Sequence, residues 1–230
     1  MSQIQELEME SKRSKLFDPF IKLPEERFST YSHLAGAALS IIGTILLGIK
    51  AREDPSRVII GVFYGLTNIF AFLASTMCHS QSISEDDHDV WAKLDEIAIF
   101  FLIAGTYTPL AYLNLEGSWL IGILSAQWAF ALIGMTVKLF EIRTPRWFTA
   151  GVYIVQGFMV FSIAHKVFVG WHWVDLLFMI LGGIAYAGGT VFYITKRPKL
   201  WPGKFGPHDL WHICVLIGAI SFFIVIFRGI

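Results

Sequence analysis

The sequence predicts an all-α integral membrane protein: a bundle of seven transmembrane helices with the N-terminus in the cytoplasm and the C-terminus outside. Hydrophobic residues make up 55% of the 230 residues and charged residues only 16%, a composition typical of membrane proteins. Seven apolar stretches are long enough to cross a hydrocarbon core that is roughly 30 Å thick and needs about 20 helical residues. Basic residues are also distributed unequally between the two ends of these stretches.

The seven predicted spans lie at residues 32–50, 57–78, 95–114, 118–137, 147–165, 173–194 and 208–228. The first follows a charged segment, the second ends in STMCH, and the third contains Pro109, which can kink a helix. The seventh follows a basic loop and begins with the pair His208 and His212. Because the connections are short, we expect residues 31–230 to form one helical domain in the membrane.

Residues 1–30 differ from the rest of the chain. They are charged, contain Pro19 and Pro24, and lack the apolar core that a secretory signal peptide needs. We expect a cytoplasmic tail, either disordered or partly an amphipathic helix on the membrane surface.

The orientation follows from the basic residues. With seven spans, thirteen basic residues fall on the N-terminal side: Lys12, Arg13, Lys15, Lys22, Arg27, Lys93, Lys138, Arg143, Arg146, Lys196, Arg197, Lys199 and Lys204. Five fall on the opposite side: Lys50, Arg52, Arg57, Lys166 and Arg228. Because basic residues are enriched in cytoplasmic loops, this asymmetry predicts a cytoplasmic N-terminus.

Four polar residues fall at one predicted membrane depth. His79 ends the second span, Asp95 begins the third, and His208 and His212 begin the seventh, all near the cytoplasmic side. Histidines four residues apart project from one helix face, and a third imidazole from the second span would complete a zinc site with its fourth position left to water. The alternatives are a chance pairing and imidazoles half-hydrated at the interface.

Asp95 would hold that water or accept its proton, because zinc lowers the pKa of a bound water toward about 7. Ser75, one turn before His79, would hydrogen-bond the water or a substrate carbonyl; the alternative is a bond to its own helix backbone. Asp, Leu and Trp separate His208 from His212, so the HExxH motif of soluble metalloproteases is absent. The pattern therefore favours a hydrolase centre that faces lipid substrates.

The two cysteines, Cys78 and Cys214, lie close to these histidines in the sequence. We expect both to be small packing residues near the reducing side, with no disulfide between them. A thiolate is also a good zinc ligand, so either cysteine is an alternative ligand. Their helical phase argues against this, since neighbours one or two positions from a ligand point roughly 100–200° away around the helix.

Five motifs follow one another along the chain: EERFSTYSHLAG at 25–36, STMCH at 75–79, LDEIAIFFLIAGTYTP at 94–109, GGIAYAGGTVFY at 182–193 and FGPHDLWHICVLIG at 205–218. Together they resemble the hemolysin III family, which is related to the progestin and adipoQ receptors and more distantly to alkaline ceramidases. The resemblance implies seven helices and a cytoplasmic-side zinc held by His79, His208 and His212. It also implies that Asp95 lies near the zinc-bound water and that Ser75 corresponds to the second-span serine.

Two positions depart from that family's pattern. Cys78 stands where the family usually has tyrosine, and Glu96 where histidine often follows the aspartate. Neither removes a ligand, although Glu96 adds a carboxylate that could shift proton affinities or face the interface. His33 is expected either to support a ligand or to hydrogen-bond Glu25 or Glu26, rather than to be a fourth ligand.

Three functions are compatible with these residues. The favoured hypothesis is an integral-membrane, zinc-dependent hydrolase of a lipid amide or ester, ceramidase-like. The second is a receptor-like or membrane-homeostasis regulatory protein with a structural zinc, and the third a cytolysin or pore, for which no obvious polar row lines any span. We expect zinc as cofactor, membrane lipids and a ceramide-like substrate rather than nucleic acid as partners, and the cell membrane as location.

Overall fold

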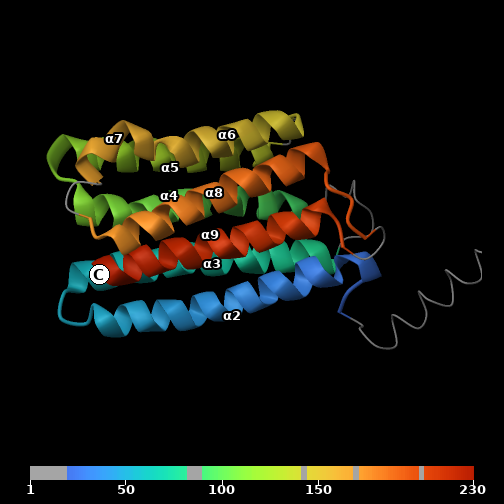
Figure 1. Ribbon diagram of the computed structural model, residues 1–230, viewed down its shortest axis with the longest axis horizontal. Coiled ribbons are helices and arrows are strands. Elements are labelled where there is room, and N and C mark those ends of the chain that lie inside the picture. The colour runs from blue at the N-terminus through green and yellow to red at the C-terminus, as the bar shows by residue number, and fades with distance from the viewer. Residues whose placement is uncertain (1–19, 82–89, 141–143, 168–170, 202–204) are drawn as a thin grey trace, which may run out of the picture.

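The computed structural model describes residues 20–81, 90–140, 144–167, 171–201 and 205–230. The described chain forms η1 (Pro24–Glu26), α2 (Arg27–Lys50), α3 (Pro55–Gln81), α4 (Val90–Asn114), α5 (Gly117–Leu139), α6 (Arg146–Phe158), α7 (Val160–Val167), α8 (Trp173–Thr195) and α9 (Pro207–Gly229). With α6 and α7 taken as one span, seven described segments are long and apolar enough to cross a membrane. The predicted seven-helix bundle is therefore confirmed, and Figure 1 shows its helices lying side by side.

The packing of the helices brings α3, which carries His79, close to α9, which carries His208 and His212. Along the chain, α2 packs on α3, α3 on α4, α4 on α5, and α8 on α9. Both α2 and α4 also contact α9, so they hold α3 and α9 side by side although the chain separates them widely. Helix α6 contacts α4 and α8.

Large apolar side chains cover the outside of the bundle. Ile59 on α3, Ile121 on α5 and Ile184 on α8 are 68%, 67% and 66% exposed. In a hydrocarbon solvent such side chains face lipid tails, while the backbone polar groups are paired within each helix. The surface is therefore that expected of a multi-pass membrane protein.

The start of α9 is defined by local sequence. Gly206 precedes the helix and Pro207 is its first residue, a position where the missing N–H of proline costs nothing. The Asp209 carboxylate accepts a hydrogen bond from the Gly206 N–H at 2.7 Å and another from the Ser29 hydroxyl at 3.1 Å. Asp209 thereby caps α9 and ties its first turn to α2, close to His208.

The fifth predicted span, 147–165, is confirmed as a membrane-spanning segment at Trp147–Lys166. It is divided at Met159, between α6 and α7. The Tyr107 hydroxyl of α4 donates a hydrogen bond to the Gly157 carbonyl at 2.5 Å and accepts one from the Val160 N–H at 2.7 Å. A side chain inserted into the backbone ladder is an established cause of helix kinks, and here it accounts for the division.

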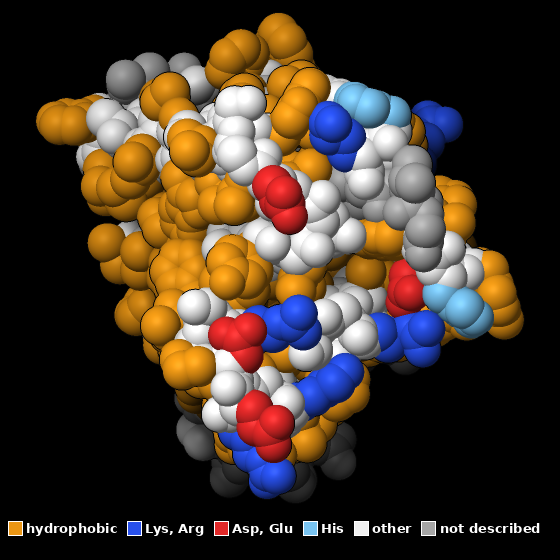
Figure 2. All heavy atoms as spheres, turned by 90° about the vertical axis from the view of Figure 1, so that its left-hand side faces the viewer, with side chains coloured by type: hydrophobic (Ala, Val, Ile, Leu, Met, Phe, Trp, Pro, Cys, Tyr) orange, Lys and Arg blue, Asp and Glu red, His pale blue; other side chains and the backbone are white. Residues whose placement is uncertain are grey.

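One end of the bundle carries the C-terminus, and Figure 2 looks onto it. Acidic and basic side chains gather there beside a broad area of hydrophobic ones. Arg57 pairs with Asp54 at 3.3 Å, and Arg228 with Asp175 at 2.5 Å. Such a surface is suited to contact with water and lipid headgroups.

At the opposite end, the segment before α2 lies against the bundle. Ile21 is 2% exposed, and the Lys22 N–H donates a hydrogen bond to the Ser80 carbonyl at 3.2 Å. Of the tail expected over residues 1–30, residues 1–19 lie outside the described part of the chain.

The orientation in the membrane is testable by cysteine labelling in a background in which serine replaces Cys78 and Cys214. His172 and Lys199 are both exposed and lie at opposite ends of α8. With a cytoplasmic N-terminus, a membrane-impermeant thiol reagent added to intact cells should label His172→Cys and miss Lys199→Cys. The reverse labelling would place the N-terminus outside.

Candidate metal centre

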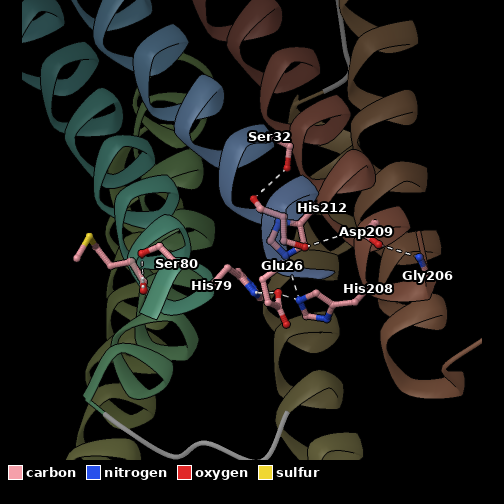
Figure 3. Close-up of polar contacts among 10 residues, drawn as sticks. Glu26, Ser32, His79, Ser80, Gly206, His208, Asp209 and His212 are labelled. Carbon is pink, nitrogen blue, oxygen red and sulfur yellow. Dashed lines mark hydrogen bonds and ion pairs between the residues drawn. The ribbon is translucent and has the colours of Figure 1, made fainter. Parts of the chain in front are cut away.

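Three imidazoles converge at the end of the bundle opposite the C-terminus. His79 extends from the last turns of α3, and His208 and His212 from the first two turns of α9. The Nε2 atoms of His208 and His79 are 3.3 Å apart, and those of His212 and His208 are 3.0 Å apart. Figure 3 shows the three rings from two helices directed toward one another.

These separations suit a tetrahedral metal ion. Two nitrogen ligands at 2.0–2.1 Å from a tetrahedral zinc lie about 3.3 Å apart. One ligand atom from each of the three histidines lies within 4.8 Å of the others. His79 is 7% exposed and His212 1%, so two of the three imidazoles are held in a nearly dry interior. The donor type, spacing and burial therefore fit a zinc ion.

Asp95 and Ser75 lie next to this cluster, as the sequence indicated. A carboxylate oxygen of Asp95, on α4, lies within 4.8 Å of a His79 ring nitrogen. Ser75 is buried and lies one turn before His79 on α3, so the two side chains share one face of that helix. Its contact with a zinc-bound water or a substrate carbonyl stays a prediction.

A cavity of about 40 Å³ opens beside the cluster. That volume accommodates about three water molecules. Its walls come from α4, α6, α8 and α9, and the residues lining it are Asp95, Glu96, Ile99, Thr149, Ala150, Tyr153, Thr190, Tyr193, His208 and Trp211. Water and a small polar group can thus reach Asp95 and His208 from the same side.

Glu26 is a member of the site whose contact sequence reasoning missed. Its Oε2 lies 2.7 Å from Nδ1 of His79, whereas His208 approaches the other ring nitrogen, Nε2. Burial alone would raise the pKa of the Glu26 carboxyl, but the hydrogen bond from His79 and the positive potential of the imidazoles outweigh it and hold that pKa below its usual value. The sequence predicts Glu25 or Glu26 only as a hydrogen-bond partner of His33, and not of His79.

His33 contacts a candidate ligand through its ring rather than through a hydrogen bond to a glutamate. The ring centroids of His33 and His212 are 3.8 Å apart, and the rings of His33 and Phe72 form a T-shaped contact. His33 is not part of the three-histidine group. Its position is that of a buried side chain supporting the ring of His212.

Glu96 has a partner of its own. Its Oε2 lies 2.6 Å from Nζ of Lys138, near the end of α5, and the Lys138 ammonium also donates to the hydroxyls of Thr144 and Thr149. The Tyr153 hydroxyl donates to the Glu96 backbone carbonyl at 2.8 Å. The extra carboxylate is thus compensated by a cation, the Lys138 ammonium.

The two cysteines have different surroundings. The thiol of Cys78 lies within 4.8 Å of donor atoms of His79 and Asp95, closer than its helical phase suggested. Cys214 packs closely against Gly189 of α8. A Cβ atom added to Gly189 would lie 2.7 Å from the Cβ of Cys214. The two cysteines form no disulfide, as the sequence predicted.

Two other histidines lie at the C-terminal end of the bundle. The ring of His165 contacts Trp119, and Nδ1 of His172 accepts a hydrogen bond from the Val174 N–H at the start of α8. Their surroundings are those of interface and capping residues.

Comparison with known proteins gives a consistent result. The family model described as "Haemolysin-III related" matches residues 21–223. The "Hemolysin-3 homolog" of Bacillus subtilis is 31% identical over 208 residues, covering 89% of this chain and 94% of that protein. The "Hemolysin-3" of Bacillus cereus is 32% identical over 211 residues, covering 90% and 92%.

A more distant relative is the "Adiponectin receptor protein" of Drosophila melanogaster, 25% identical over 227 residues, which cover 88% of this chain and 50% of that protein. The family match covers the first six spans and most of α9, and both bacterial relatives align over nearly their full length. The chain therefore belongs to the haemolysin-III related family, which also resembles the adiponectin receptors, and is a multi-pass protein of the cell membrane.

Proposed function

We propose that this protein is an integral-membrane, zinc-dependent hydrolase that acts on a lipid amide or ester, with a ceramide-like amide as the type of substrate. The observation that carries the proposal is the convergence of three imidazole nitrogens beside the Asp95 carboxylate and a cavity with room for water. Three protein ligands leave one position of a tetrahedral zinc open, which is typical of catalytic rather than structural sites.

The chemistry divides between the ion and the side chains. Zinc would supply Lewis acidity, which makes water more acidic and polarises a carbonyl. The Asp95 carboxylate would accept a proton from the attacking water, whose oxygen forms a bond to the carbonyl carbon. Asp95 would return the proton to the leaving nitrogen or oxygen as the bond to the carbonyl carbon breaks. The Ser75 hydroxyl would hydrogen-bond the attacking water or the substrate carbonyl.

A second candidate is a receptor-like or regulatory protein in which zinc has a structural role. One observation favours it: the three histidines join α3 to α9, so a bound ion would tie two helices together at one end of the bundle. This candidate does not require Asp95 beside the cluster or a cavity at His208, and we therefore place it second.

The metal is tested first. Purified protein should contain about one zinc per chain, as expected for one three-histidine site. Replacing His79, His208 or His212 with alanine should remove most of it, because two imidazoles hold zinc weakly. His165→Ala and His172→Ala serve as controls and should leave the zinc content unchanged. Elemental analysis of the detergent-purified variants measures this, and zinc loss confined to the two control variants would refute the site.

Catalysis is tested at Asp95. Asp95→Asn keeps the shape of the side chain and removes the base, so zinc content and melting temperature should change little. Hydrolysis of ceramide or of a lipid ester should fall by about 10²–10⁴-fold, the usual contribution of a positioned general base. The measurement is product release from a panel of lipid amides and esters.

The same panel separates the two candidate functions. Wild-type protein that binds zinc and loses thermal stability on chelation, yet hydrolyses no lipid in an Asp95-dependent manner, would exclude the hydrolase. The structural-zinc candidate would then be the better explanation.

A further inference from the structure

The two ring nitrogens of His79 face different partners. Its Nε2 lies 3.3 Å from Nε2 of His208, inside the three-histidine cluster, and its Nδ1 lies 2.7 Å from Oε2 of Glu26. Figure 3 shows Glu26 next to His79 at the centre of the cluster. A neutral imidazole carries one N–H, and a carboxylate at Nδ1 favours the tautomer with the hydrogen on that atom. The lone pair of Nε2 is then free to bind a metal.

The contact between Glu26 and His79 is largely shielded from water. The side chains of His79 and Glu26 are 8% and 18% exposed. A hydrogen bond to a charged acceptor is stronger in such a setting than on an open surface. Glu25, one residue earlier in the same turn, is exposed.

The backbone around Glu26 is anchored independently of its side chain. Glu26 ends the turn η1, and its N–H donates to the Leu23 carbonyl at 3.0 Å. Ile21 is buried, and the Lys22 N–H bonds to the Ser80 carbonyl at the end of α3, one residue beyond His79. The segment at residues 20–26 therefore presents the carboxylate to His79 from a fixed position.

We propose that Glu26 is a positioning residue of the metal centre: its carboxylate accepts the Nδ1–H of His79 and thereby directs Nε2 of that ring at the ion. This inference rests on the metal-binding part of the proposed function and does not depend on hydrolysis. It makes the segment before the first span a component of the centre, although that segment contributes no ligand. His79 is supported by a carboxylate and His212 by the ring of His33.

The test measures zinc affinity by competition with a chelator, using the full-length protein in detergent. Glu26→Ala should bind zinc about 10–100-fold more weakly than wild type, the usual effect of removing a carboxylate behind a histidine ligand. Glu26→Gln should fall between the two, because its amide oxygen still accepts the hydrogen bond but carries no charge. Glu25→Gln is the matched control and should bind zinc as wild type does.

A second measurement distinguishes positioning from a merely structural contact. Melting temperatures are recorded with and without zinc, since zinc stabilises the folded state according to its affinity. A positioning role predicts that the zinc-dependent increase shrinks in Glu26→Ala and partly returns in Glu26→Gln. A lower melting temperature without zinc, combined with wild-type zinc affinity, would overturn the inference. Wild-type protein that binds no zinc would instead overturn the proposed function.

Discussion

The hydrocarbon solvent is the constraint on which the rest of this structure depends. Lipid offers no hydrogen-bonding partner, so each span must pair its own backbone groups and can tolerate polar side chains only where the protein itself provides partners. The histidine cluster satisfies this condition at the end of α3 and the beginning of α9, where hydrogen bonds can come from several segments. The histidine cluster therefore lies at one end of the bundle, where both water and lipid can approach it.

Each group at the centre is held by a residue from elsewhere in the bundle. Glu26 fixes the ring of His79, His33 packs on His212, and the Asp209–Ser29 hydrogen bond ties the first turn of α9 to α2. The first span and the segment before it therefore organise a cluster to which they contribute no histidine ligand. This arrangement holds imidazoles from α3 and α9 within a few ångströms of one another.

The spans could be predicted because apolar length is a local property of the sequence. A shared membrane depth was a necessary but not a sufficient condition for His79 to meet His208 and His212, and the family resemblance indicated that these three lie together. The role of Glu26 could not be predicted: Glu25 and Glu26 are equivalent in the sequence, and the turn at Pro24–Glu26 decides which of them faces inward. The ion pair between Glu96 and Lys138 could not be predicted either, because the two residues lie on different helices.

The division of the fifth span at Met159 restricts which aromatic residues of this chain can be replaced by other aromatic residues. Aromatic residues make up 15% of the sequence, and on a lipid-facing surface one ring substitutes readily for another. Tyr107 is different, because its hydroxyl completes the backbone ladder at Gly157 and Val160 of a neighbouring helix. Phenylalanine would fill the same space yet leave a carbonyl and an N–H unpaired inside the membrane. At this position a single oxygen atom, rather than size or hydrophobicity, determines which side chain is acceptable.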